Sequence, residues 1–152
     1  MARVITIICG FILLLSSCEK DDSNNVSNNI SSNERQVVDI VNNERAKLEI
    51  APLEIDESLM KSCDIRAEEI VTTFSHKRPD GQSCFTVIKT SYGYAAENIA
   101  YGQKNAEEVM SSWMNSEGHR NNIISEKYSH IGVGCYEHNN RLYWVQLFIS
   151  KK

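Results

Sequence analysis

Apolar residues recur every three or four positions in three stretches of this 152-residue chain, which predicts three amphipathic helices. The first helix begins at Ser31-Ser32-Asn33-Glu34, which has the spacing of a capping box, and ends at Ala51-Pro52. Its predicted apolar face consists of Val37, Ile40, Val41 and Leu48. Its predicted outward positions are Glu34, Arg35, Asn42 and Arg45.

The second predicted helix opens near Asp56 and leads the chain to His76. Its apolar positions are Leu59, Cys63, Ala67, Ile70 and Phe74. The third helix begins near Asn105, and its apolar stripe is Val109, Met110 and Trp113. We expect Gly118 to end this third helix in a left-handed conformation, which places His119 and Arg120 beside the exposed carbonyls.

Two strands are predicted at the end of the chain. Ile131, Val133 and Cys135 alternate with other residues, and residues 142–149 are apolar on both faces except at Gln146. The latter is therefore expected to be a central strand, joined to the former by a hairpin whose Asn139-Asn140 accepts positive backbone angles.

The middle of the chain is less regular. Arg78-Pro79-Asp80-Gly81 is a turn sequence that should hold His76 on a rigid corner. Residues 82–93 have no clear period, and the segment from Cys84 to Ile88 fits either a strand or a buried helical turn. A strand that is apolar on both faces needs helices above and below it, so the pattern predicts a mixed α+β domain.

Residues 1–17 have the pattern of a lipoprotein signal peptide. A basic start, Met1-Ala2-Arg3, precedes an apolar run from Val4 to Leu15 that is too short to span a bilayer. Leu15-Ser16-Ser17-Cys18 follows as a lipobox, so we expect cleavage before Cys18 and acylation of that cysteine. An ordinary signal peptide with an incidental cysteine is the alternative.

Residues 18–30 are expected to form a lipidated flexible tether, because they are rich in Ser and Asn and poor in apolar residues. Glu19-Lys20-Asp21-Asp22 resembles the surface-export signal of some Gram-negative lipoproteins, and a merely charged start of the tether is the alternative. We therefore expect an exported protein whose lipid on Cys18 anchors it to the outer membrane or the cell surface. Residues 31–152 form a single predicted domain.

Charge and cysteine content narrow the function. The net charge of −4 argues against nucleic acid as a partner. The domain contains Cys63, Cys84 and Cys135, so one disulfide with one free thiol and three buried thiols both remain open. Core packing is expected for Cys63 and Cys135, and Cys84 is the preferred candidate for a bridge.

Two histidines and two acids are the candidate site residues: His76, Glu97, Glu117 and His119. Imidazole and carboxylate groups are ligands for zinc or a similar divalent cation. However, Glu117 and His119 are two residues apart, a poor spacing for one helix face, and the chain has no HExxH motif. No Gly-x-Ser-x-Gly elbow supports a serine nucleophile, and export disfavours a reactive thiol.

Three segments together resemble one known family: Ser75-His76-Lys77-Arg78-Pro79-Asp80-Gly81, Ala96-Glu97-Asn98-Ile99-Ala100 and Trp113 to Ile123. They are similar to the bacterial branch of the CAP superfamily of cysteine-rich secretory, antigen 5 and pathogenesis-related proteins. The similarity runs from about Glu34 to the end and includes Ile131-Gly132-Val133-Gly134 and Tyr143 to Phe148. It implies a three-layer α-β-α sandwich with a small antiparallel sheet.

The resemblance also implies a cleft lined by two histidines and two acids, which holds a divalent metal in some members. His76, Glu97 and His119 match three of these positions. Many relatives place the fourth acid three residues after the tryptophan, where this chain has Ser116, while Glu117 lies one residue further on.

We therefore predict an extracellular binding module for a small-molecule, lipid or peptide ligand. Zinc or another divalent cation fits the cleft but is not required for this function. The alternative is a metal-dependent hydrolase of peptide or cell-wall material, in which His76 and His119 hold the ion and Glu97 or Glu117 is the base. A purely structural tether is a third interpretation.

Overall fold

The computed structural model describes residues 30–152, so the predicted signal peptide, Cys18 and nearly all of the predicted tether lie outside the described residues. The elements in chain order are α1 (Ser32–Ala46), β1 (Glu54–Ile55), α2 (Glu57–Thr72), the 3-10 helix η3 (Cys84–Val87), β2 (Tyr92–Tyr101), α3 (Ala106–Met114), α4 (Glu117–Ile123), β3 (His130–His138) and β4 (Arg141–Lys151).

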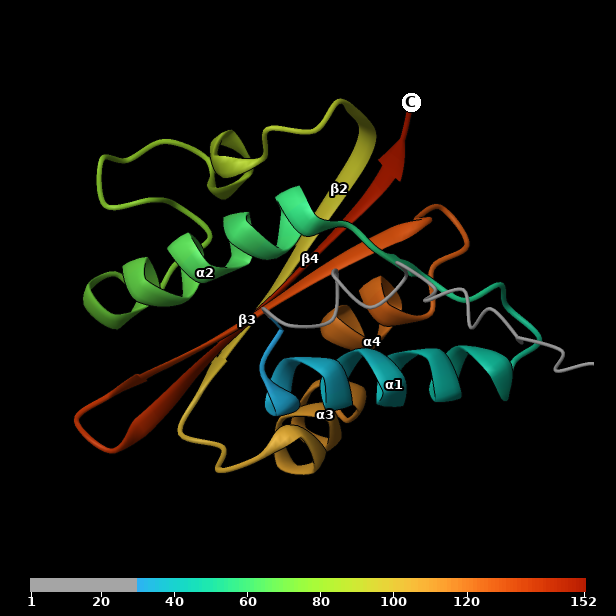
Figure 1. The fold of residues 1–152 in the computed structure, drawn as a ribbon, viewed down its shortest axis with the longest axis horizontal. Coiled ribbons are helices and arrows are strands. Elements are labelled where there is room, and N and C mark those ends of the chain that lie inside the picture. Colours follow the sequence, from blue (N-terminus) through green and yellow to red (C-terminus); the bar gives the residue numbers. More distant parts are fainter. Residues whose placement is uncertain (1–29) are drawn as a thin grey trace, which may run out of the picture.

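The strands form one sheet in the order β1-β3-β4-β2. Strand β4 pairs antiparallel with both β3 and β2, and the two-residue β1 extends the sheet by parallel pairing with β3. Helix α2 covers one face of the sheet, while α1, α3 and α4 lie on the opposite side (Figure 1). The predicted three-layer α-β-α sandwich and the central position of the 142–149 strand are thus confirmed.

Alternation along β4 builds a core on each face. Trp144 and Phe148 pack against α1, α3 and α4, whereas Val145, Leu147 and Ile149 pack against α2. All five side chains are fully buried. Burial of a large apolar side chain stabilises a fold by roughly 1.5–3 kcal/mol, so β4 contributes strongly to both cores.

Two glycines of β3 allow α2 to approach the sheet closely. A Cβ added to Gly132 would lie 2.5 Å from the backbone carbon of Leu59, and one added to Gly134 would lie 2.5 Å from that of Cys63. Because both neighbours are backbone atoms, no side-chain rotation relieves such a contact. The glycines therefore set the position of α2, which delivers the chain to His76.

The first helix is shorter than predicted, and its buried face, which includes Val37 and Val41 as predicted, also contains two residues predicted to point outward. It ends at Ala46, after which Glu49 adopts a φ of 59° and reverses the chain before Ala51-Pro52. Leu48 therefore lies outside the helix and is 47% exposed. Glu34 and Arg45, both predicted to point outward, are buried. Arg45 is retained because it donates to the carbonyls of Ala51, Ile123 and Ser125.

Other boundaries also differ from the prediction. Helix α2 ends at Thr72, so Phe74 is 48% exposed rather than part of its apolar face. Gly118 does not end α3; that helix ends at Met114, and Gly118 lies inside α4, which starts anew after Ser116. Residues 84–87 form the 3-10 helix η3, so the segment for which a strand and a buried helical turn were both open is a helical turn.

Strand β2 was not predicted, whereas the hairpin was. Asn139 and Asn140 have φ of 49° and 59° and join β3 to β4 as expected.

Cys63, Cys84 and Cys135 are free thiols, so the preference for Cys84 as a disulfide partner was wrong. The three-thiol alternative holds, with Cys63 and Cys84 buried and Cys135 half-buried.

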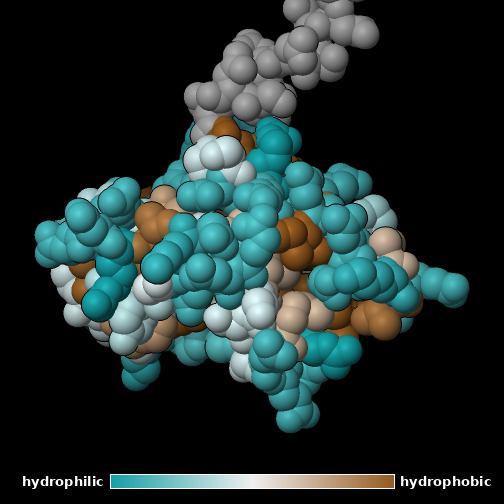
Figure 2. All heavy atoms as spheres, turned by 90° about the horizontal axis from the view of Figure 1, so that it is seen from below, coloured by the Kyte–Doolittle hydropathy of each residue, from teal (hydrophilic) through white to brown (hydrophobic). Residues whose placement is uncertain are grey.

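Within residues 30–152, no helix is both long and apolar enough to cross a membrane. The face seen from below in Figure 2 is mostly hydrophilic, with small and separate hydrophobic areas.

Candidate functional site

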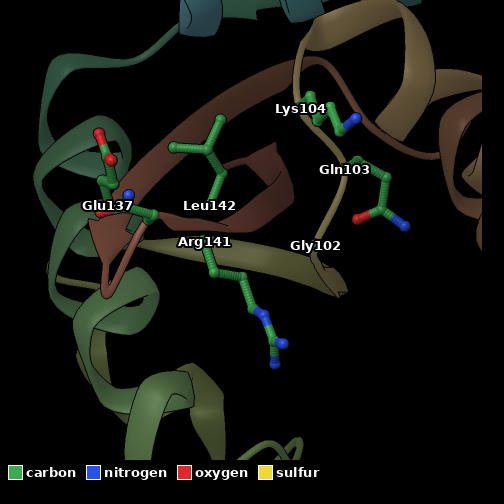
Figure 3. A pocket seen from close by; sticks show the side chains of 7 residues that line it. Gly102, Gln103, Lys104, Glu137, Arg141 and Leu142 are labelled. Atoms are coloured by element: carbon green, nitrogen blue, oxygen red, sulfur yellow. The ribbon is translucent and has the colours of Figure 1, made fainter.

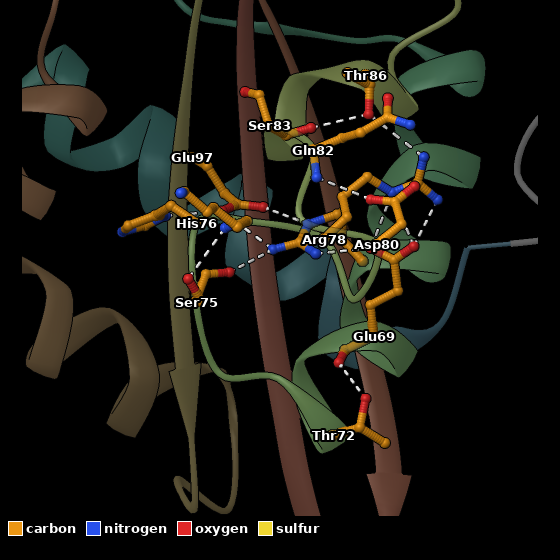
Figure 4. A network of polar contacts seen from close by, with 12 residues as sticks. Glu69, Thr72, Ser75, His76, Arg78, Asp80, Gln82, Ser83, Thr86 and Glu97 are labelled. Carbon is orange, nitrogen blue, oxygen red and sulfur yellow. Dashed lines mark hydrogen bonds and ion pairs between the residues drawn. The ribbon is translucent and has the colours of Figure 1, made fainter.

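Glu97 is the centre of the candidate site. It lies on β2, and its side chain is only 1% exposed. Its Oε1 accepts a hydrogen bond from Arg66 Nε at 2.8 Å, and its Oε2 is 2.8 Å from His76 Nδ1 (Figure 4). A buried carboxylate is costly without partners, so the Arg66 ion pair explains how Glu97 is tolerated here.

Arg66 also fixes the corner that carries His76. This fully buried side chain extends from α2 and donates to the Ser75 carbonyl at 2.7 Å and to Glu69 at 2.7 Å. Glu69 in turn accepts from Arg78 Nε at 2.9 Å. The chain thus turns a hydrogen-bonded corner before β2, and one arginine connects this corner to the acid on β2.

This network shifts the pKa values of both partners. Burial opposes ionisation of Glu97, but hydrogen bonds from His76 and Arg66 outweigh it and hold the Glu97 pKa below its usual value. The hydrogen bond to Glu97 raises the pKa of His76 despite partial burial. Glu97 is thus an ionised carboxylate that orients the His76 ring and favours the imidazole carrying its proton on Nδ1.

His119 approaches the site from the other side of the sheet, on α4. Burial lowers its pKa, and a smaller contribution comes from the nearby charge of His76. The two histidines come from opposite layers and line separate hollows. Strand β2 is the last strand of the sheet, so both can meet at its outer edge.

A buried chain of amides fixes α4 relative to β2. Asn98 donates to the backbone carbonyl of His119 at 3.1 Å and to Gln146 Oε1 at 3.0 Å. It also accepts from Asn122 Nδ2 at 2.9 Å. Asn98 and Gln146 are fully buried and directly opposite each other in the sheet. Two adjacent residues of β2 therefore position the two histidines. Glu97 contacts His76 directly, and Asn98 holds helix α4, which carries His119.

We expect the Asn98→Ala variant to lose about 2–4 kcal/mol of unfolding free energy, because it leaves Gln146 Oε1 and the His119 carbonyl without their buried donor. Asn122→Ala removes only one contact at the rim and should cost about 1 kcal/mol. Urea denaturation of both variants measures the difference. Equal costs would contradict the role given to Asn98.

The structure brings together only part of the predicted ligand set. Among residues 30–152, one group of three potential ligands has all its ligand atoms within 4.8 Å: His76, Cys84 and Glu97. Burial raises the pKa of the Cys84 thiol to about 12, with a further contribution from Glu97. Cys84 is therefore a protonated thiol beside the carboxylate.

His119 and Glu117 lie outside that compact group. Glu117 is exposed, whereas Ser116 lines the same hollow as His119. The role of Glu117 as a fourth ligand stays a prediction.

Two hollows lie along β2. One, of about 410 Å³, is lined by His76, Cys84, Glu97, Asn122 and Tyr128 among others. The other, of about 270 Å³, includes His119, Phe74, Tyr101 and Trp113 in its lining. A further hollow of about 360 Å³ lies at the β3–β4 hairpin and is lined by Gly102, Gln103 and Arg141 among others (Figure 3). None of the predicted site residues lines that one.

Two residues of the site were not assigned a role from sequence. Arg66 lies three residues after Cys63 and four before Ile70, on the apolar stripe of α2, and a charged residue there indicates a buried partner. Asn98 follows Glu97 in the segment from Ala96 to Ala100, but its hydrogen-bond partners come from distant segments. No signal in this single sequence identifies those partners.

The family model of the cysteine-rich secretory protein family, CAP, matches residues 38–148. The chain belongs to the CAP family. It is 44% identical to the uncharacterized protein YkwD of Bacillus subtilis over 127 residues, which cover 80% of this chain and 49% of YkwD. The chain therefore spans about half the length of this relative.

Solved structures share the CAP fold. An extracellular protein containing an SCP domain from Bacillus anthracis matches with a TM-score of 0.72 and 27% identity, over 78% of this chain and 40% of that one. NaASP2, solved with Zn²⁺, matches with a TM-score of 0.61 and 14% identity over 83% of this chain and 87% of that one. The latter likeness shows the fold alone.

Proposed function

We propose that this CAP protein is an exported, lipid-anchored binding module whose cleft binds its ligand between His76 and His119. The extracellular Bacillus anthracis relative supports export. The observation that supports binding rather than hydrolysis is that both carboxylate oxygens of Glu97 are already in contact with Arg66 and His76. Glu97 thus serves to orient a histidine.

The donor set fits a divalent cation. His76 uses Nδ1 for Glu97, and its Nε2 has no hydrogen-bond partner in the described part of the chain. Burial lowers the pKa of His119, which favours the neutral form that binds metals, whereas Glu97 raises the pKa of His76, so a cation there must displace a proton. His76 and His119 would hold the ion, with Glu97 as the carboxylate behind His76. NaASP2, which shares the fold, has been solved with Zn²⁺.

A bound cation would supply Lewis acidity, which leaves the hydrolase as the second candidate. Its base is the weak point. A general base works best with a pKa near the working pH, whereas Arg66 and His76 hold the pKa of Glu97 below its usual value. A hydrolytic rate on peptides or cell-wall fragments that disappears in His119→Ala would favour the hydrolase instead.

We expect the full-length protein in detergent to bind one zinc ion and the His76→Ala and His119→Ala variants to lose stoichiometric binding. Isothermal titration calorimetry with zinc, together with elemental analysis after dialysis, measures this. Cys84→Ser is the matched control and should bind zinc within about threefold of the parent, since the proposal places the two histidines, and not Cys84, on the ion. Unchanged zinc binding in both histidine variants would refute the proposed cation site.

The anchor is tested separately. In cells fed with a labelled fatty acid, the parent chain should carry the label and partition into the membrane fraction. The Cys18→Ser variant should lose the label and be released, because the acyl chains on Cys18 provide the attachment. A labelled Cys18→Ser variant would contradict the predicted lipidation site.

A further inference from the structure

The outer edge of β2 has a defined hydrogen-bonding pattern. Gly102 N donates to Leu142 O at 2.9 Å, and these residues continue the antiparallel register of β2 and β4. Since bonded and non-bonded pairs alternate along an antiparallel ladder, the even-numbered residues of β2 bond to β4. The N–H and C=O groups of Ala95, Glu97, Ile99 and Tyr101 therefore point away from the sheet.

No strand of the described chain pairs with this edge, because β2 is last in the strand order. The two hollows lie along it: Ala95, Ala96 and Glu97 line one, and Ile99, Ala100 and Tyr101 line the other. The outward backbone groups therefore border two hollows that follow one another along the strand, and we call these two hollows together the groove. From residue 95 to residue 101 it is roughly 20 Å long, at about 3.3 Å per residue.

Aromatic and ionisable groups divide the groove into distinct parts. Phe74 and Tyr101 are half-exposed and in edge-to-face contact, 4.7 Å between ring centroids, at one end. His76 and His119 line its middle. The one carboxylate in the lining, Glu97, is neutralised by buried Arg66. The groove therefore offers an apolar end and a centre that is neutral or cationic.

We propose that this groove binds an extended peptide that adds a strand to the outer edge of β2. The inference rests on the proposed binding function and names the ligand class. A row of backbone donors and acceptors at two-residue spacing matches another extended backbone, which neither a lipid chain nor a sugar reproduces. The peptide carries an acidic side chain opposite the histidines and an apolar side chain against Phe74 and Tyr101.

One contact limits the pairing. Trp113 Nε1 donates to the Ile99 carbonyl at 3.4 Å, so that acceptor is already in use. The added strand therefore pairs with Ala95, Glu97 and Tyr101.

The test uses the full-length protein in detergent and an immobilised library of acetylated, amidated hexapeptides. Bound sequences should be enriched in Asp or Glu at a central position with an apolar residue beyond it. The best peptide is then resynthesised with single N-methyl groups, because N-methylation removes one backbone donor and keeps the side chain. Methylation at alternate positions should weaken binding at least about tenfold, and methylation at the positions between should have little effect.

The protein-side test compares Ala95→Pro with Ala95→Val. Both enlarge a half-buried side chain, but only proline removes the outward N–H, and an outward edge N–H is where proline is tolerated in a sheet. Peptide affinity should fall at least about tenfold in Ala95→Pro and stay near the parent value in Ala95→Val. Zinc titration of both variants serves as the control for an intact cleft.

Failure here is distinguishable from failure of the proposed function. The peptide inference alone is overturned if the protein binds zinc at the histidines but binds no hexapeptide at about 1 mM. It is also overturned if the effect of N-methylation does not alternate along the peptide. Binding of a cell-wall glycan or of phosphatidylcholine vesicles in place of any peptide also overturns it. If the parent chain binds neither zinc nor any peptide, the proposed function is overturned as well.

Discussion

Replacing Arg66 with methionine is expected to lower the free energy of unfolding by about 3–5 kcal/mol, because it leaves the buried Glu97 carboxylate without its ionic partner. Arg66 and Glu97 have side-chain exposures of 0% and 1% and approach to 2.8 Å. Methionine keeps much of the volume, so lost packing contributes little. Urea denaturation at neutral pH measures the effect.

The control for this variant is a double-mutant cycle with Glu97→Gln. The Arg66→Met/Glu97→Gln protein should cost less than the sum of the single changes, since neither charge then remains buried and unpaired. Arg78→Ala, which removes a partly exposed ion pair with Glu69, should cost at most about 1 kcal/mol. Additive single effects at Arg66 and Glu97 would contradict the assigned pair.

The effect of Arg66→Met should also depend on pH in a defined direction. The pKa of Glu97 is lowered in the folded protein from its ordinary value of 4.5. The stabilisation from its ionised form is therefore complete above that value and is lost as the pH falls through the folded pKa. The difference between parent and variant should accordingly be largest near neutral pH and shrink in acid.

Gly134→Ala is the second variant with a large expected effect. The added Cβ would lie 2.5 Å from backbone atoms of Cys63, so α2 must shift away from β3. Overpacking of this kind costs typically 1–3 kcal/mol, and we expect about 3 kcal/mol because backbone, not a side chain, must move. The displaced α2 carries Arg66, so zinc affinity should fall as well.

Gly118→Ala is the matched control for this second variant. Gly118 lies within α4, and a Cβ there would meet nothing within 4 Å. Alanine is the better helix former, so this change should be neutral or stabilise by about 0.5–1 kcal/mol. Thermal unfolding of the two variants separates close packing from a general effect of losing a glycine. A neutral Gly134→Ala would show that α2 is not held by this contact.

The accuracy of the sequence predictions follows from how local each signal is. Helix α2 and strands β3 and β4 carry clear periodicities and were predicted close to their observed ranges, and the start of α3, though not its end, was also predicted. Strand β2 was missed because Glu97 and Asn98 interrupt any apolar alternation, although both are buried. Their burial depends on partners in α2, α4 and β4, which no local pattern encodes.

The same reasoning applies to the site. His76, Glu97 and His119 were predicted from motifs that resemble the CAP family. The contact between Glu97 and His76 is now explained by the corner after α2. Arg66 had a detectable signal, a charge on an apolar stripe, whereas Arg45 was predicted to point outward although it lies four residues after Val41 on the buried face of α1. In both cases the sequence analysis did not predict that the arginine is buried.

The central proposal is that His76 and His119, oriented by Glu97 and Asn98, hold a divalent cation, and that the closer His76-Cys84-Glu97 group does not. X-ray absorption at the zinc edge, on the full-length protein with one equivalent of zinc, tests it most directly. The account predicts nitrogen and oxygen ligands at about 2.0–2.1 Å and no sulfur. A zinc–sulfur shell at about 2.3 Å that disappears in Cys84→Ser would contradict it.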